Sequence, residues 1–179
     1  MRLISEQGGQ KLSVGRLAPF AAAGAAVSVA AAAAGLAVDA GSIWYRSLRK
    51  PVWQPPPWAF GAVWTPLYAM IAYAGGRALR GSCKRRERVR VAVSLAVNLT
   101  LNAGWRLFFR LRSPKAGLAG TLLLDLSNVE LVHRTAQTDR TAAKALLPYA
   151  AWCLFATALN GAIARQNHGV MSASKRGRD

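Results

Sequence analysis

Acidic side chains are scarce in this sequence, because Asp and Glu account for 7 of its 179 residues, whereas Lys and Arg account for 24. The net charge of +17 excludes an acidic disordered chain, and a total of two cysteines excludes a disulfide-rich scaffold. No nucleotide-binding loop, nucleophile triad or zinc-ligand spacing is present. Glu130 and His133 form one Glu-x-x-His pair, whereas a di-iron bundle needs two. We therefore expect no metal site, no required cofactor and no recognisable catalytic constellation.

Long apolar blocks are what the sequence has instead, since 53% of its residues are hydrophobic and 17% are charged. Five blocks approach the roughly 20 residues that a helix needs to cross a bilayer core. A soluble chain of this length has no room to bury five such segments, whereas lipid covers them if each backbone group is paired within its own helix. The sequence therefore predicts an all-α integral membrane protein, a bundle of five transmembrane helices. The predicted blocks are residues 17–38, 59–79, 91–109, 116–133 and 145–164, which form one domain, 17–164, between a basic N-terminal segment, 1–16, and a basic tail, 165–179, that we expect to be flexible.

Nearly all the basic residues fall between the apolar blocks, where interfacial side chains belong. The densest run extends from Lys84 to Arg90, and we expect it to face anionic lipid headgroups. A nucleic-acid interface is the alternative, but no aromatic side chains interleave with this run as they do in single-strand binders, so we expect lipid and not nucleic acid as the partner. Positive charge divides almost evenly between the two membrane faces, and only the 77–90 connection favours a cytoplasmic N-terminus. The alternative interpretation of the first block is a secretory signal, although its apolar run is longer than a typical signal core.

The connection between the first two blocks is rich in tryptophan and proline. Residues 39–58 read DAGSIWYRSLRKPVWQPPPW, in which four prolines exclude a regular helix. Trp44, Trp53 and Trp58 are half of the six tryptophans in the chain. One interpretation is an aromatic belt at the headgroup level. The other is a proline-stiffened lid over a flat aromatic ligand, because rigid rings stack with little loss of entropy.

Three of the later blocks carry aromatic and amide side chains on one helical face each. Polar groups are expensive against lipid, so we expect these faces to point into the bundle. One interpretation is hydrogen bonding between helices, which would account for the asparagines but not for the aromatic residues. The other is a ligand pocket, which fits three stripes that converge under a tryptophan-rich lid. The stripes are Phe60, Trp64 and Tyr68 in the second block, Asn98, Asn102, Trp105 and Phe109 in the third, and Tyr149, Trp152, Ala156 and Asn160 in the fifth.

Three segments resemble the tryptophan-rich sensory protein and translocator protein family, whose mammalian members were called peripheral-type benzodiazepine receptors. Residues 44–68 read WYRSLRKPVWQPPPWAFGAVWTPLY and are similar to the family's W-Y-x-x-L-x-K-P-x-W-x-P-P followed by F-x-x-V-W-x-x-L-Y. Residues 101–109 read LNAGWRLFF, similar to L-N-x-x-W-S-x-x-F-F. Residues 148–160 read PYAAWCLFATALN, similar to P-Y-x-x-W-x-x-F-A-x-x-L-N. Because the segments occur in the family's order, the sequence is identified as a member of that family, and its high Ala and Arg content indicates a bacterial source.

The resemblance implies a five-helix membrane fold, a homodimer, and a pocket for porphyrins, such as protoporphyrin IX or haem, and for other planar lipophilic ligands. It implies a sensory, regulatory or transport role, and we expect the bacterial cell membrane, not the outer membrane, as the location. The alternative is an enzyme that degrades porphyrin in light and oxygen, for which motif position assigns Trp44 and Trp152 as the catalytic residues. The residues that we assign to the ligand pocket are Trp44, Tyr45, Trp53, Pro55, Trp64, Tyr68, Asn98, Asn102, Trp105, Tyr149, Trp152, Ala156 and Asn160.

Overall fold

The computed structural model describes residues 17–32, 43–104 and 113–167, and within these ranges the chain forms six helices and no strand. The helix Leu17–Ala32 comes first. It is followed by α2 (Ile43–Ser47), α3 (Pro57–Gly81), α4 (Arg85–Ala103), α6 (Pro114–Thr138) and α7 (Arg140–Gln166). The all-helical prediction is therefore confirmed. Residues 33–38 of the first predicted block and 105–109 of the third, the segment 1–16 and most of the tail lie outside the described residues.

The helices extend beyond the apolar blocks that predicted them. In α4 the first six residues belong to the basic run, because Arg and Glu are good helix formers and need not be buried to be helical. The prolines of the connection act as predicted from Leu48 to Pro56, but the five residues of α2 just before them are helical, which corrects the expectation for that part. Pro57 then takes the first position of α3, where its missing N–H has no helical partner to lose.

One end of the bundle is closed by two short, hydrogen-bonded turns. Asp139 alone separates α6 from α7, and its Oδ1 accepts a hydrogen bond from the backbone N–H of Ala142 at 2.9 Å, which caps α7. Its Oδ2 accepts another from Arg77 Nε at 2.8 Å, which links the turn to α3. At the turn between α3 and α4, buried Ser82 donates from Oγ to the carbonyl of Ala78 at 2.8 Å. We call this end, with its many Lys and Arg residues, the basic end.

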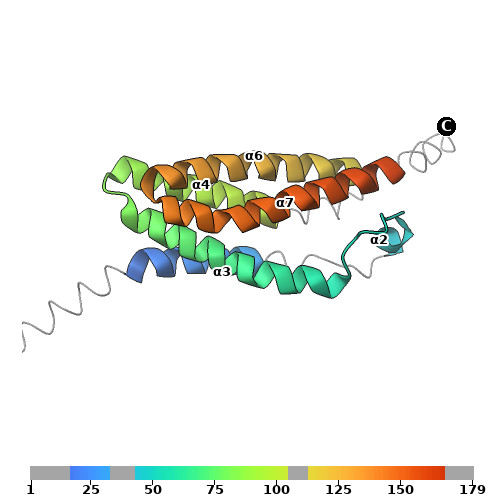
Figure 1. Ribbon diagram of the computed structural model, residues 1–179, viewed down its shortest axis with the longest axis horizontal. Coiled ribbons are helices and arrows are strands. Elements are labelled where there is room, and N and C mark those ends of the chain that lie inside the picture. Colours follow the sequence, from blue (N-terminus) through green and yellow to red (C-terminus); the bar gives the residue numbers. More distant parts are fainter. Residues whose placement is uncertain (1–16, 33–42, 105–112, 168–179) are drawn as a thin grey trace, which may run out of the picture.

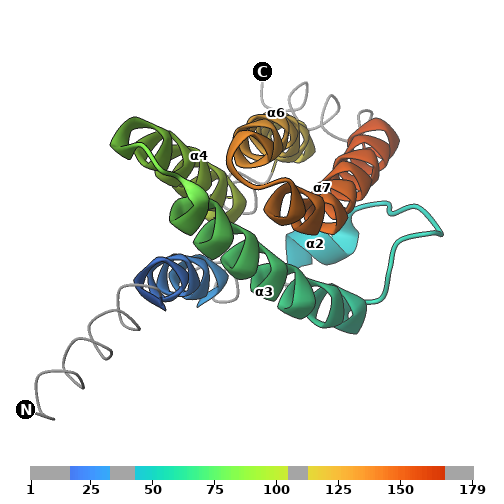
Figure 2. The same ribbon diagram turned by 60° about the vertical axis from the view of Figure 1, so that its left-hand side comes forward.

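The helices form a bundle in which α6 and α7 pack together most extensively, α4 lies against α6, and α3 lies against α7 (Figure 1). Figure 2 shows the helix Leu17–Ala32 on the far side of α3 from α7. Two glycines of α3 allow that approach: a Cβ at Gly76 would lie 2.9 Å from Phe20 Cα, and one at Gly75 would lie 3.3 Å from Ala23 Cβ. Small residues at such a contact are typical of membrane helices, whose backbones gain stability by packing closely.

Many large apolar side chains point outward from the bundle. Leu126 and Val129 on α6 are 67% and 69% exposed, and Leu154 on α7 is 60% exposed. Among the described helices, α7 is both long and apolar enough to cross a membrane, and Leu17–Ala32 is a shorter apolar helix. The apolar exterior is the surface that lipid, and not water, would cover.

Candidate functional site

The tryptophan- and proline-rich connection is attached to the end of the bundle opposite the basic end. Figure 1 places α2 where α3 begins and α7 ends. Asn167, buried just after α7, receives a hydrogen bond at Oδ1 from the backbone N–H of Arg49 at 3.0 Å. Its Nδ2 donates to the Arg49 carbonyl at 2.9 Å. These two bonds hold the connection against α7, and we call this end the loop end.

Five aromatic side chains from three parts of the chain lie at the loop end, and ring contacts join four of them. Trp152 stacks on Phe155 within α7, with ring centroids 5.1 Å apart. Trp53 of the connection meets Phe155 edge-on at 5.7 Å, and Phe60 of α3 meets Trp152 edge-on at 5.9 Å. Trp64 lies one turn further along α3. We call Trp53, Phe60, Trp64, Trp152 and Phe155 the aromatic cluster; ring contacts join the first two and the last two of these residues, while Trp64 contacts Tyr68 and Tyr149.

Trp64 connects this cluster to a chain of buried polar groups. Its ring stacks on Tyr68 at 5.2 Å and lies 6.1 Å from the ring of Tyr149 on α7. The hydroxyl of Tyr68 donates to Asn102 Oδ1 at 3.2 Å, and Asn102 Nδ2 donates to the Tyr149 hydroxyl at 3.3 Å. Helices α3, α4 and α7 are therefore joined by hydrogen bonds directly below the rings.

The chain continues to α6 through Asn98, which is fully buried. The Tyr149 hydroxyl donates to Asn98 Oδ1 at 2.9 Å, and Asn98 Nδ2 donates to Asn128 Oδ1 at 2.7 Å and to Ser127 Oγ at 3.2 Å. We call Tyr68, Asn102, Tyr149, Asn98 and Asn128 the polar chain. Each member donates to the next, so the orientations of the Asn102 and Asn98 amides are set by neighbours on both sides.

A second polar contact inside the bundle joins α6 to α7. Thr157 Oγ1 donates to Asp125 Oδ2 at 2.6 Å. This hydrogen bond between helices gives an acidic side chain of the fourth apolar block a structural role. The second oxygen of Asp125, Oδ1, is buried and has no hydrogen-bond partner among the described residues.

Positive charge lies on the connection, the same segment that carries Trp53. Lys50 Nζ lies 4.2 Å from the centre of the Tyr45 ring, a cation–π contact. Arg46 and Arg49 are exposed close to it in sequence. Gln54 Nε2 donates to the Tyr45 hydroxyl at 3.4 Å, and burial raises the pKa of that hydroxyl above its usual value. The loop end therefore combines ring faces with cations and neutral hydroxyls.

The structure brings together many of the residues assigned from the sequence. Trp64, Tyr68, Asn98, Asn102, Tyr149 and Trp152 all belong to the aromatic cluster or the polar chain. Trp53 is 47% exposed and contacts Phe155 of the cluster edge-on, while Pro55 is half-buried in the same connection. Ala156 and Asn160 lie further along α7, and Asn160 Nδ2 donates to the carbonyl of Ala156 in its own helix. The Trp44 side chain and the whole of Trp105 lie outside the described residues.

Four residues of the loop end and the polar chain were not assigned to the pocket. Phe60 and Phe155 are parts of the sequence motifs, and their spacing from Trp64 and Trp152 was the available signal. Asn128 stood out only as a polar residue in an apolar block. Asn167 carries no such signal, because it follows the last apolar block in a polar stretch.

Comparison with known proteins adds independent information. Residues 20–165 match the TspO/MBR family. Over 128 residues the chain is 40% identical to the tryptophan-rich protein TspO of Chlorobaculum tepidum, which covers 70% of this chain and 80% of that protein. The translocator protein of Homo sapiens is 34% identical over 128 residues, which are 70% of this chain and 76% of that protein. The tryptophan-rich protein TspO of Archaeoglobus fulgidus is 37% identical over 121 residues, which are 67% of this chain and 77% of that protein.

Proposed function

Because this chain belongs to the TspO/MBR family, and is therefore a membrane protein, we propose that it binds porphyrins and related planar lipophilic ligands at the loop end of its helical bundle. The observation that carries the proposal is the aromatic cluster. Its rings come from the connection, α3 and α7, and Trp53 lies on the exposed side of it. A flat macrocycle that enters between Trp53 and α7 would replace ring–ring contacts by contacts of the same kind.

The charges around the cluster favour a ligand with acidic groups. Protoporphyrin IX is a flat apolar macrocycle that carries two carboxylates. Arg46, Arg49 and Lys50 lie on the connection, where their cations would meet those carboxylates at the membrane surface. Below the rings, the polar chain would present the Tyr68 hydroxyl to the ligand. The pocket would thus match the apolar body with rings and the acidic edge with cations.

The same site supports the alternative, which is light- and oxygen-dependent degradation of the bound porphyrin. Trp152 is the observation in its favour, because its indole is half-buried within the cluster that the porphyrin would enter. Illumination of the complex tests this alternative through the absorption band of the porphyrin. If bound and free porphyrin bleach at the same rate, the protein is a binder and not an enzyme.

The physiological setting is part of the proposal. We propose a homodimer in a bacterial cell membrane, with a sensory, regulatory or transport role. Membership of the TspO/MBR family supports a membrane location, and a bacterial relative and an archaeal relative are both named tryptophan-rich protein TspO. Native mass spectrometry of the detergent-solubilised protein tests the dimer, and membrane fractionation tests the location.

The binding proposal is tested by titrating the purified full-length protein with protoporphyrin IX and following porphyrin fluorescence. We expect saturable binding that weakens about tenfold in the Trp44→Phe, Trp152→Phe double variant, because two indoles are lost. Trp58→Phe is the matched control, because Trp58 is 74% exposed, and it should leave the affinity unchanged. Equal affinity of the double variant and the control would contradict the proposal.

The role of the loop cations has its own comparison. The dimethyl ester of protoporphyrin IX has the same macrocycle but no carboxylate charge. We expect the wild-type protein to bind the diacid several-fold more tightly than the ester, and an Arg46→Gln, Arg49→Gln variant, which keeps Lys50, to lose most of that preference. If the wild-type protein already binds both equally, the cations do not recognise the ligand.

A further inference from the structure

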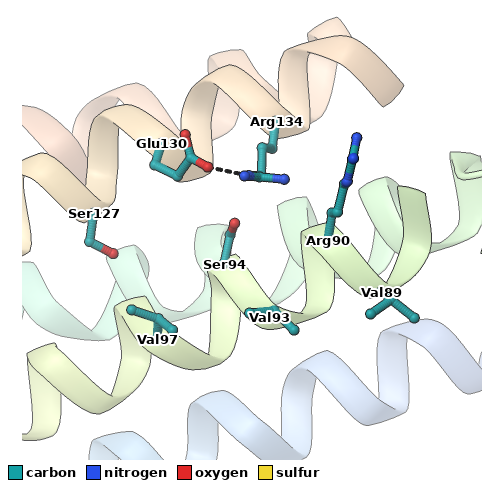
Figure 3. A pocket seen from close by; sticks show the side chains of 8 residues that line it. All are labelled: Val89, Arg90, Val93, Ser94, Val97, Ser127, Glu130 and Arg134. Carbon is teal, nitrogen blue, oxygen red and sulfur yellow. Dashed lines mark hydrogen bonds and ion pairs between the residues drawn. The ribbon is translucent and has the colours of Figure 1, made fainter. Parts of the chain in front are cut away.

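A pocket separate from the aromatic cluster lies between α4 and α6, toward the basic end. Its volume is about 420 Å³, and it opens at the surface of the bundle. The aromatic cluster lies on α3, α7 and the connection, so the two regions share no residue. Figure 3 shows the walls of the pocket: one comes from α4, the other from α6, and Arg90 and Arg134 lie together at one end.

The α4 wall of this pocket is an apolar stripe. Val89, Val93 and Val97 recur every four residues and so share one helix face. They are 52%, 55% and 49% exposed, so that much of each side chain is left uncovered. Along the helix axis the stripe is about 12 Å long, which matches a stretch of an extended hydrocarbon chain and lies parallel to the helices, as lipid chains do.

The end of the pocket near the basic end is cationic. Arg134 forms an ion pair with Glu130, one turn earlier on α6, which leaves that pair with no net charge. Arg90 makes no ion pair or hydrogen bond with any residue that the structure describes, and Figure 3 shows its side chain reaching toward the α6 wall. Lys84, Arg85 and Arg86 are exposed at the start of the same helix. The free charge at the mouth is therefore positive.

We propose that this pocket is a binding site for one anionic phospholipid. Its phosphate would lie between Arg90 and Arg134, with hydrogen bonds from both guanidinium groups, and one acyl chain would lie along the valine stripe. Arg is suited to this task, because its planar fork of donors matches a phosphate. Basic pockets between membrane helices bind acidic headgroups by the same combination of charge and apolar wall.

Charge argues against a second copy of the chain as the occupant. A two-fold interface would bring the same face of both copies together. With the two-fold axis along the bundle, Arg90 and its basic neighbours would lie at the same level as their counterparts, and Glu130, the single acidic residue of the pocket, is already paired. A lipid with a negative headgroup complements the site, whereas a second copy repeats its charge.

The test is native mass spectrometry of the delipidated full-length protein, titrated with dioleoyl phosphatidylglycerol or dioleoyl phosphatidylcholine. We expect one tightly held phosphatidylglycerol and no comparable phosphatidylcholine. Arg90→Gln should weaken phosphatidylglycerol binding at least about fivefold, because a charge-assisted hydrogen bond to the phosphate is lost. Arg86→Gln is the matched control, since it removes the same charge from an exposed position outside the pocket, and it should weaken binding less than twofold.

A second pair of variants tests the apolar wall without changing charge. Val93→Trp fills the pocket and should reduce binding about tenfold, whereas Leu126→Trp, on an exposed part of α6 outside the pocket, should not. Equal losses in Arg90→Gln and Arg86→Gln would mean general attraction to the basic end and would overturn the site. Competition by glycerophosphate as strong as that by the lipid would overturn the role of the acyl chain. A change of dimer fraction in Val93→Trp, with lipid binding intact, would assign the pocket to a second copy.

Discussion

The two halves of α3 differ in how they are held. In the half toward the basic end, Ile71, Ala74 and Ala78 are fully buried, and Gly75 and Gly76 bring the backbone against Phe20, Ala23 and Leu95. In the half toward the loop end, Phe60, Trp64 and Tyr68 are only partly buried and contact other rings. One half is fixed by backbone contact, which leaves no room to adjust. The other is held by side chains that can be exchanged for a ligand of similar chemistry.

This difference indicates that one half of α3 stabilises the bundle, while the other half can adjust to a ligand. Ring pairs contribute about 0.5–1.5 kcal/mol each and tolerate several geometries, so rearranging them for a ligand costs little. Close packing at the glycines stabilises the bundle, and any larger residue at these positions would prevent it. The polar chain begins at Tyr68, at the boundary between the halves, and ties the adjustable half to the fixed one.

The largest effect is expected from a side chain added in the fixed half. In Gly76→Val the new Cβ would lie 2.9 Å from Phe20 Cα, a backbone atom that cannot turn away. The helix Leu17–Ala32 must then shift, and we expect the free energy of unfolding to fall by about 3 kcal/mol. Unfolding of the purified protein in sodium dodecyl sulfate measures it.

Gly61→Val is the matched control, in the adjustable half of the same helix. A Cβ at Gly61 would have no atom within 4 Å, so we expect a change of no more than about 0.5 kcal/mol. Equal destabilisation by the two variants would remove the distinction between the halves.

A smaller effect is expected from breaking the polar chain at its centre. Asn98→Leu keeps a side chain of similar size but leaves the Tyr149 hydroxyl and Asn128 Oδ1 without their partner. Two unpaired groups in the interior should lower the free energy of unfolding by about 2 kcal/mol. Ala96→Leu, on the exposed side of α4, should change it little. A stable Asn98→Leu variant would show that the amides are not the tie between helices.

Much of this fold follows from the sequence, but the helix ends do not. Apolar runs locate the helices, because burial or lipid contact requires them. The ends depend on other forces: α7 begins at Arg140 because Asp139 caps it, five residues before the apolar block, and α4 begins within a charged run. Hydropathy contains no term for a cap or for the helix propensity of arginine.

The sequence predicts which residues belong to the site, but it does not predict which of them hydrogen-bond to each other. Spacing placed Asn98, Asn102 and Tyr149 on interior faces, as the structure shows. It could not show that Asn98 bonds Asn128, 30 residues away, because that depends on how α4 and α6 are turned toward each other. The attachment of Arg49 by Asn167 depends likewise on where α7 ends.

A pH-dependent effect is expected at the basic end, where Arg77 of the fixed half meets Asp139. The backbone N–H of Ala142 and the Arg77 guanidinium hold the pKa of the Asp139 carboxyl below its usual value of 3.8. The folded state therefore favours the charged form. That contribution is complete above the unfolded pKa and is lost as the pH falls through the lower folded pKa.

The measurement is the free energy of unfolding at a series of pH values from neutral to acid. At pH 7 we expect Asp139→Ala to lose about 1 kcal/mol, the effect of an N-cap. Asp139→Asn should keep part of the cap and remove the acid-dependent loss. Ser113→Ala, which removes the cap of α6, should lower stability equally at every pH, because a hydroxyl does not titrate. If stability is still lost at acid pH in Asp139→Asn, the loss is due to another titrating group.

The smallest effect on stability is expected at Trp152 of α7, which contacts Phe60 in the adjustable half of α3. The same substitution should clearly weaken ligand binding. Trp152→Phe retains a ring that can contact Phe60 and Phe155, so the free energy of unfolding should change by no more than about 0.5 kcal/mol. The smaller ring offers less surface to a porphyrin, and we expect about fivefold weaker binding of protoporphyrin IX. Gly76→Val should give the reverse pattern in protein that remains folded, because the contact it breaks is remote from the rings. If Trp152→Phe were instead the more destabilising of the two, the aromatic cluster would be part of the rigid core, and a ligand could not enter it without unfolding the loop end.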